Sequence, residues 1–356
     1  MTGKPRPLII NALGALADPN TPPADRAGAD DPGSGQTGLS DRVLRDAHAS
    51  GLTAVNVTIG AVTDLGDPFQ DTMADLAAWD TALCRHSGDL LQVREAADLS
   101  RARDTGRIGV IYGVQNTTML GADASRVAVF AERGVRIVQL TYNPANRVGG
   151  GSQAPADRPL TDFGQEVVAQ LNHHHLMVDL SHSGTQTCLD AIHASTRPVS
   201  INHTGCRALV DLPRNKTDAE LRLVAEQGGF IGIYSMPFLS TSGSATAEDV
   251  VEHIRHALNV CGEDHVGIGT DGTTTPVDDL AAFRRHIAVA VARRRNQGIG
   301  AAGETPDTLP FVADLSGPGQ FTRLATLLAG RGVRSSVIDK VLGANFLRYA
   351  HDIWDH

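Results

Sequence analysis

The sequence predicts an α/β protein folded as a single (β/α)8 barrel of the TIM type over residues 1–356. Two observations lead to this prediction. Short apolar runs alternate with amphipathic segments, and polar residues collect at the C-terminal ends of several apolar runs. Runs that are apolar throughout are typical of parallel strands buried on both faces. A doubly wound sheet is the alternative, but it usually carries a glycine-rich phosphate turn after its first strand, and NALGALADPN is not such a turn.

Eight apolar runs are expected to form the barrel strands. In chain order they are Leu8–Leu13, Ala54–Gly60, Ile108–Gln115, Arg136–Tyr142, Leu176–His182, Val199–His203, Phe230–Ser235 and His265–Asp271. Helices are expected at the amphipathic segments Ser40–Ser50, Asp71–His86, Asp123–Arg133, Asp162–Asn172, Thr217–Gln227 and Thr246–Cys261. Several of these segments open on Ser, Thr or Asp, which are preferred at helix N-caps. The tract His173–His175 is expected to end a helix, with adventitious metal binding as the alternative.

Two longer segments interrupt the regular alternation. Asp18–Asp41 is rich in Pro, Gly and Asp and follows the first strand, on the side where barrel active sites are built. We interpret residues 18–41 as a βα loop or lid, with a disordered surface loop as the alternative. Residues 296–319 are expected to form a loop before the C-terminal helices.

Composition excludes several classes of protein. Hydrophobic residues make up 41% of the 356 residues and aromatic residues only 4%, which predicts a large and mainly aliphatic core. The net charge of −9 argues against binding to nucleic acid or to anionic membranes. No signal peptide or membrane span is expected, because no long uninterrupted apolar run occurs. The four cysteines form no CxxC pair, so we expect reduced thiols and a cytoplasmic location.

Five polar residues stand at the C-terminal ends of predicted strands, which a barrel brings together around one mouth. They are Gln115, Tyr142, His182, His203 and Asp271. A hydrogen-bonded structural role is the simpler explanation for either histidine alone. The convergence of two histidines and a carboxylate indicates a site, because unpaired polar groups are costly to bury. Imidazole and carboxylate ligands suit zinc or a similar divalent ion.

The segments around both histidines resemble a known family. VDLSHSGTQT and ASTRPVSINHTGCRAL resemble the signature of the renal or membrane dipeptidases, peptidase family M19, within the amidohydrolase superfamily of metal-dependent barrels. LTYNPANRVGGGS, LPRNKTDAEL, EDHVGIGTDG and LGANFLR resemble other segments of that family, in the same order and with similar spacing. The resemblance implies a metal-dependent hydrolase of dipeptides or similar small molecules, and a homodimer.

The resemblance also implies roles for individual residues. His182 and His203 match the ligands of one of two metals, usually zinc, and Asp271 matches the residue that handles the proton. Arg214 matches the residue that pairs with the carboxylate of the substrate, a task that suits its planar fork. A structural brace through Asp211 or Asp218 is the alternative for Arg214. Tyr142 and Asn143 are expected to contact the substrate.

Four positions depart from the family pattern. The HxD motif of the first strand is replaced by Leu13 and Ala15, the bridging Glu by Gln115, and a substrate-facing His by Tyr142. Aliphatic side chains cannot bind a metal, and a neutral amide cannot bridge two cations as a carboxylate does. We therefore expect at most one weakly held zinc ion, on His182, His203 and Gln115.

Two questions stay open from the sequence. Cys206 follows His203 by three residues and is either a replacement soft ligand or, more simply, a buried small hydrophobe. The whole protein is either a hydrolase of a dipeptide or small carboxylated amide with one metal or none, or a catalytically silent or repurposed homologue. In the second case the mouth binds a small carboxylated ligand or a partner.

Overall fold

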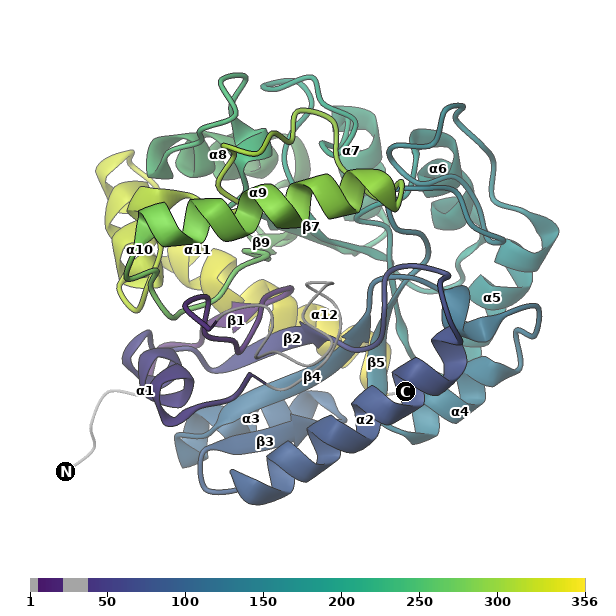
Figure 1. Cartoon of the computed structure of the whole chain (residues 1–356), viewed down its shortest axis with the longest axis horizontal. Coiled ribbons are helices and arrows are strands. Elements are labelled where there is room, and N and C mark those ends of the chain that lie inside the picture. The colour runs from purple at the N-terminus through teal and green to yellow at the C-terminus, as the bar shows by residue number, and fades with distance from the viewer. Residues whose placement is uncertain (1–5, 22–37, 356) are drawn as a thin grey trace.

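The computed structural model describes residues 6–21 and 38–355, and these residues form a nearly closed parallel barrel surrounded by helices (Figure 1). The barrel strands are β1 (Ile10–Asn11), β2 (Ala54–Thr58), β4 (Ile108–Val114), β5 (Val135–Gln139), β6 (Met177–Asp179), β7 (Ser200–Thr204), β8 (Phe230–Ile233) and β9 (Val266–Ile268). They are hydrogen-bonded in this order, and every pairing is parallel. The predicted fold class is confirmed.

Backbone contacts beyond the ends of β9 and β1 close the ring. The amide of Ala12 donates to the carbonyl of Ile268 at 2.9 Å, and the amide of Asp271 donates to the carbonyl of Leu13 at 2.9 Å. A parallel bridge between Ala15 and Thr273 continues this contact toward the mouth. The first and last strands therefore position each other's C-terminal ends.

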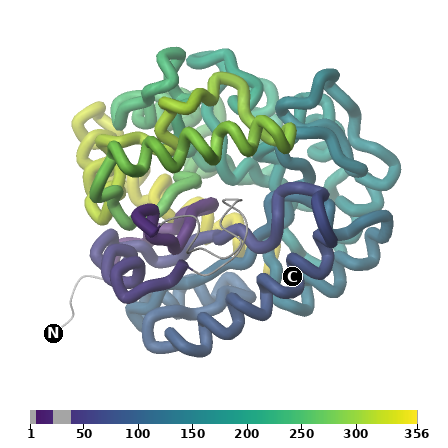
Figure 2. Tube along the Cα trace, in the orientation of Figure 1, coloured from purple at the N-terminus to yellow at the C-terminus, as the bar shows by residue number. Residues whose placement is uncertain are grey.

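Helices follow the strands and cover the outside of the barrel (Figure 2). Their bounds are α1 (Asp41–Ala49), α2 (Pro68–Arg85), α3 (Ala96–Thr105), α4 (Arg126–Glu132), α5 (Asp162–His173), α6 (Thr185–Ala194), α7 (Asp218–Glu226), α8 (Ala247–Cys261), α9 (Leu280–Asn296), α10 (Gln320–Gly330), α11 (Ser335–Asp339) and α12 (Asn345–Trp354). The side chains of Ser40, Thr217 and Thr246 cap the helices that follow them, as their positions predicted, and Thr161 rather than Asp162 caps α5. Helix α5 ends at His173, so the histidine tract does end a helix.

The structure differs from the sequence prediction in one strand. The short strand β3 (Leu90–Val93) pairs with β4 only from Ile108 to Ile111 and lies outside the ring of barrel strands. Four residues with a central Gln give too weak an apolar signal to predict a strand. Most barrel strands are also shorter than predicted; β6, for example, ends at Asp179, before Ser181 and His182.

Of the two predicted long loops, only the second lies largely within the described residues. Most of the predicted lid, residues 22–37 of 18–41, lies outside the described residues. Residues 297–312, within the predicted loop 296–319, pack against the mouth: the carbonyl of Ile299 accepts from Asn143, and the amide of Val312 donates to the carbonyl of Ser235. Helix α9, which leads into this segment, crosses in front of β7 and β9 in Figure 1.

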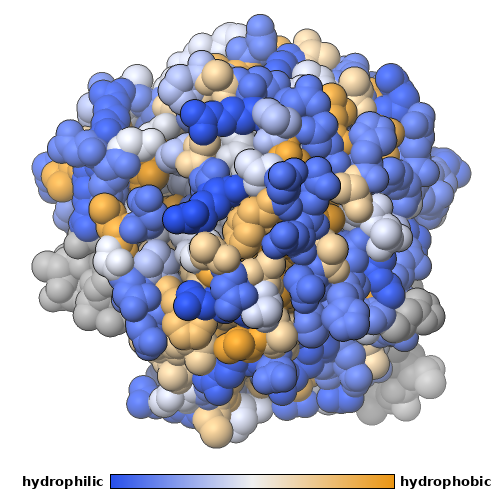
Figure 3. Space-filling view, turned by 90° about the vertical axis from the view of Figure 1, so that its right-hand side faces the viewer, coloured by the Kyte–Doolittle hydropathy of each residue, from blue (hydrophilic) through white to orange (hydrophobic). Residues whose placement is uncertain are grey.

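The core is built mainly from Val, Leu and Ile, as the low aromatic content predicted. The face shown in Figure 3 is mostly hydrophilic, with apolar residues in small groups. Among the described residues, no helix has the length and apolar character needed to cross a membrane.

Candidate active site

The predicted mouth residues all follow, or end, strands at the same end of the barrel. His203 lies within β7, and Gln115 comes directly after β4. Tyr142, His182 and Asp271 each stand three residues beyond the last residue of β5, β6 and β9. Since parallel strands of a barrel end at one face, the fold gathers these side chains as the sequence pattern suggested.

His182 and His203 form a direct contact at the centre of this group. Their Nε2 atoms lie 2.9 Å apart, and both side chains are buried. The Nδ1 atom of His182 lies 2.8 Å from Oδ1 of Asn143. Tyr142 covers the other side of His182, with its ring stacked at a centroid distance of 4.3 Å.

The surrounding hydrogen bonds assign the protons of this pair. Asn143 must direct Nδ2 to the carbonyl of Ile299, 2.8 Å away, because that carbonyl can only accept. Its Oδ1 therefore accepts from Nδ1–H of His182, which leaves Nε2 of His182 as an acceptor. Nε2 of His203 then carries the hydrogen that joins the two rings. Nδ1 of His203 is left as a buried acceptor without a partner among the described residues.

Both imidazoles are held neutral. Burial lowers the pKa of His182 and of His203 well below the usual value, and the nearby positive charge of Arg214 acts in the same direction. Lys216 adds to the effect on both rings. Neutral imidazole is the form that binds metals and accepts protons.

Two cations from one loop hold the backbone on either side of His182. Nη1 of Arg214 donates to the carbonyl of Ser181 at 2.7 Å, and Nζ of Lys216 donates to the carbonyl of Ser183 at 2.5 Å. Both cationic side chains are buried, with 3% and 1% of the residue exposed. Residues 205–216, between β7 and α7, thus fix the position of His182.

The brace at Arg214 does not use the carboxylates that the sequence suggested. Asp211 lies 4.0 Å from Arg207, and Asp218 lies 2.7 Å from His256. The guanidinium of Arg214 instead binds the Ser181 carbonyl and lies 5.7 Å from the ring of Tyr234. The positive charge of Arg214 also lowers the pKa of Asp271, so the guanidinium is close enough to affect the mouth electrostatically.

Lys216 has a buried partner that the sequence analysis missed. Its Nζ lies 3.3 Å from Oε1 of Glu220, and the side chains of the pair are only 2% and 1% exposed. Oε2 of Glu220 accepts from the amide and hydroxyl of Thr217 in a capping box at the start of α7. The signal for the pair was present as KTDAE, a Lys four residues before a Glu that also completes a capping box.

Asp271 occupies an unusual backbone position at the mouth. Its φ is +56°, a left-handed conformation that is uncommon outside glycine. Burial raises its pKa to about 6, although the charges of Arg214 and Arg294 oppose that rise. Arg294 comes from α9 and pairs with Glu304, so the segment over the mouth contributes to the electrostatics of Asp271.

Gln115 is not joined to the histidines by any hydrogen bond of the described chain. Its Nε2 donates to Oγ1 of Thr58 at 2.7 Å, and its backbone carbonyl accepts from Gln139. Cys206 is directed toward His253: its amide donates to Nδ1 of His253, and its thiol contacts the carbonyl of His253. Burial raises the pKa of the Cys206 thiol, so this residue is a buried small hydrophobe.

Few side chains in the mouth could serve as ligands of a metal ion. Within residues 6–21 and 38–355, no group of three His, Cys, Asp or Glu side chains is placed to hold an ion. Nε2 of His182 and of His203 do converge, and Asn143 supports His182 as an outer partner of a metal ligand should. His203 lacks such a partner at Nδ1, and Leu13 and Ala15 offer no donor for a second ion. His182 and His203 are therefore the side chains that would hold an ion in this mouth.

Comparison with known proteins decides the family. Residues 27–294 match the sequence profile of membrane dipeptidase (peptidase family M19). The chain belongs to this family. The resemblance inferred from the sequence is therefore confirmed.

Three proteins illustrate how similar the chain is to known sequences and structures. An uncharacterized protein in the pqqA 5′ region of Klebsiella pneumoniae is 28% identical over 300 residues, which cover 81% of this chain and 98% of that protein. Dipeptidase tcpJ of Claviceps purpurea is 26% identical, and the match covers 81% of this chain and 61% of that protein. A crystal structure of an amidohydrolase from Pseudomonas aeruginosa is 30% identical, with a TM-score of 0.81 over 98% of this chain and 97% of that one.

Proposed function

We propose that the mouth binds a dipeptide or a small carboxylated amide, and that the protein hydrolyses it with at most one divalent ion. The observation that carries this proposal is the gathering of a cation, a carboxyl with a raised pKa and two neutral imidazoles at one end of the barrel. Relatives named dipeptidases support the substrate class.

Each of these groups has a separate task. Arg214 donates one N–H to the carbonyl of Ser181, and its other N–H groups bind the carboxylate of a ligand. Asp271, with a pKa of about 6, accepts and returns a proton near neutral pH. His182 and His203 would hold the ion, which when bound supplies a water activated for attack.

A catalytically silent homologue is the second candidate, and a specific observation favours it. Leu13 and Ala15 are aliphatic, and the amide of Gln115 is turned to Thr58. Because structural and catalytic zinc sites normally use three or four protein ligands, a pair of imidazoles holds an ion weakly. In this candidate the mouth binds the same carboxylated ligand without turnover.

Metal content and hydrolysis together separate the candidates. We expect elemental analysis of protein equilibrated with zinc to give no more than one ion per chain. A panel of dipeptides should then show hydrolysis that a chelator removes and that zinc restores. Binding without hydrolysis supports the silent homologue, and two ions per chain would contradict the one-ion proposal.

The role of Arg214 is tested by substitution. Arg214→Met removes the charge and the paired donors, and Arg214→Lys keeps only the charge. We expect the affinity for a dipeptide to fall about tenfold or more in the Met variant and less in the Lys variant, which corresponds to about 1.5–3 kcal/mol. Arg207→Met is the matched control, because Arg207 lies in the same loop and binds the carbonyls of Asn215 and Pro213. A large fall in melting temperature with unchanged affinity would show that Arg214 is only a brace.

A further inference from the structure

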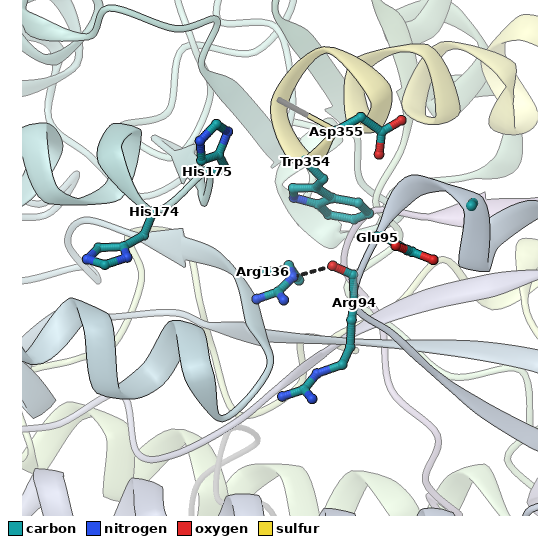
Figure 4. A pocket seen from close by; sticks show the side chains of 8 residues that line it. Arg94, Glu95, Arg136, His174, His175, Trp354 and Asp355 are labelled. Atoms are coloured by element: carbon teal, nitrogen blue, oxygen red, sulfur yellow. Dashed lines mark hydrogen bonds between the residues drawn. The ribbon is translucent and has the colours of Figure 1, made fainter.

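A hollow of about 660 Å³ lies at the opposite end of the barrel from His182 and His203. Arg136 reaches it from the N-terminal end of β5, and His174 and His175 reach it from the segment that leads into β6. Trp354, at the end of α12, forms another wall. Figure 4 shows Arg136 below the indole ring of Trp354, with both histidines on the far side of Arg136.

Two guanidinium groups in this hollow have no carboxylate partner among the described residues. Nη2 of Arg94 donates to the carbonyl of Glu132 at 2.6 Å. Nε of Arg136 donates to the carbonyl of Arg94 at 2.5 Å, drawn as a dashed line in Figure 4, and its Nη1 donates to the carbonyls of Ala131 and Val135. Neutral carbonyls orient both groups, and neither group forms an ion pair with a described residue.

The two carboxylates at the edge of the hollow are engaged elsewhere. Glu95 lies 3.6 Å from Arg101 and caps the start of α3. Asp355 pairs with His351 at 2.5 Å and accepts from the amide of Ala96. Neither carboxylate lies within ion-pair distance of Arg94 or Arg136 in the described chain.

The like charges are close enough to affect each other. Burial lowers the pKa of Arg136 and the charge of Arg94 lowers it further, whereas the negative charge of Asp98 acts in the opposite direction. Arg136 is half-buried and Arg94 is exposed, and a bound anion would offset the repulsion between the two charges. The geometry of a planar guanidinium suits the oxygens of a carboxylate or phosphate.

Trp354 adds an aromatic surface and a donor. Its ring packs edge-on against Phe346, with a centroid distance of 6.2 Å, so its orientation is fixed. Its Nε1 is shielded from solvent and has no hydrogen-bond partner within the described part of the chain. Buried indole N–H groups usually find an acceptor.

We propose that this hollow binds a small aromatic anion, a planar ring that carries carboxylate or phosphate groups. The anionic oxygens lie against Arg94 and Arg136, and the ring lies against Trp354. This site is separate from the mouth at the other end of the strands and does not depend on the hydrolysis proposed there.

Trp354 makes the proposal directly testable, because the chain has only two tryptophans. In protein labelled with 5-fluorotryptophan, fluorine NMR should show one signal for Trp354 and one for the buried Trp79, assigned with Trp79→Phe. Phthalate is the probe, inorganic phosphate lacks the ring, and benzyl alcohol lacks the charge. We expect phthalate to shift only the Trp354 signal, saturably, with a Kd below about 1 mM. Phosphate should bind at least tenfold more weakly, and benzyl alcohol should produce no saturable shift.

Two arginine variants and one control complete the test. Arg136→Met and Arg94→Met should each weaken phthalate binding about tenfold or more. Arg107→Met makes the same charge change just before β4, outside the hollow, and should leave binding unchanged. If Arg136→Met does not fold, the test rests on Arg94→Met. Arg94 makes one side-chain hydrogen bond, to the carbonyl of Glu132, so its replacement should not prevent folding. No saturable shift, or equal binding by the folded arginine variants and the control, would overturn the proposal.

Discussion

Removal of the buried ammonium of Lys216 should destabilise the protein strongly and in a pH-dependent way. Lys216→Met leaves Glu220 buried at 1% exposure with its Oε1 unpaired, and removes the donor to the carbonyl of Ser183. Loss of one partner of a buried ion pair costs about 3–5 kcal/mol. An unfolding entropy of about 2.1 cal/mol/K per residue gives about 0.75 kcal/mol/K for a chain of this length. The melting temperature should therefore fall by about 4–7 °C.

The pH dependence identifies the unpaired carboxylate as the cause. Burial alone would raise the pKa of Glu220, but Lys216 and the bonds from Thr217 hold it below the usual value. The pair therefore stabilises the folded state above the normal pKa of a Glu, and this contribution is lost as the pH falls. Without Lys216 the carboxyl takes up a proton at a higher pH, so the deficit of the variant should be largest near pH 8 and shrink toward pH 5.

Melting curves of three variants over this pH range test the reasoning. Lys216→Met/Glu220→Leu removes both charges and should recover most of the lost stability at pH 8, because a well-packed apolar pair can replace a buried ion pair. Lys340→Met is the control, since Lys340 pairs with Glu263 and Asp264 at the surface and should change melting little. A Lys216→Met deficit that is below 1 °C, or that is the same at pH 5 and pH 8, would refute the argument.

Three further predictions concern the mouth. Asp271 has a pKa of about 6 in the folded protein against a usual 3.8. As the pH rises, the unfolded chain therefore loses this proton before the folded protein does, and the carboxyl destabilises the fold at pH values above about 6. Asp271→Asn, which also tolerates a positive φ, should therefore raise the melting temperature at pH 7.5 but not at pH 4, measured in chelator, and should abolish hydrolysis. Asn143→Ala should weaken zinc binding about 10–100-fold, measured in competition with a chelating dye, because His182 loses its hydrogen-bond partner at Nδ1. Gln153→Ala is the control: Gln153 accepts from the amide of Ala302 in the same covering segment, and its loss should leave zinc binding unchanged. Leu13→His, Ala15→Asp and Gln115→Glu together should raise the zinc content toward two ions per chain, and an unchanged content would show that the end of β1 is wrongly placed for ligands.

The barrel could be predicted because its strands are buried on both faces and therefore read as continuous apolar runs. The convergence of His182 and His203 could be predicted for a related reason, since both stand at or just beyond strand ends. The strand β3 could not, because it pairs with only half of β4 and contains a polar residue.

Local sequence did not reveal the partners of several polar side chains. Gln115 is oriented by Thr58 on a neighbouring strand, and Asn143 by a carbonyl more than 150 residues away. Lys216 and Glu220 were visible as a helical pair, but charged residues are usually exposed, and only the packing of the β7 loop on His182 shows that they are buried. The assignments of Asn143 and Tyr142 to substrate binding stay predictions.

The two cations that hold the backbone around His182 are spaced like the carbonyls that they bind. Arg214 and Lys216 are two residues apart, and so are the carbonyls of Ser181 and Ser183 that they hold. Arg214 lies in a turn that the amide of Asn215 closes on the carbonyl of Leu212, and Lys216 forms a parallel bridge with Cys206 directly after it. A single residue inserted between Arg214 and Lys216 would change the separation of the two cations, so that they no longer match two carbonyls on either side of His182. Designs that shorten or graft the loop after β7 must therefore keep both cations and the spacing between them.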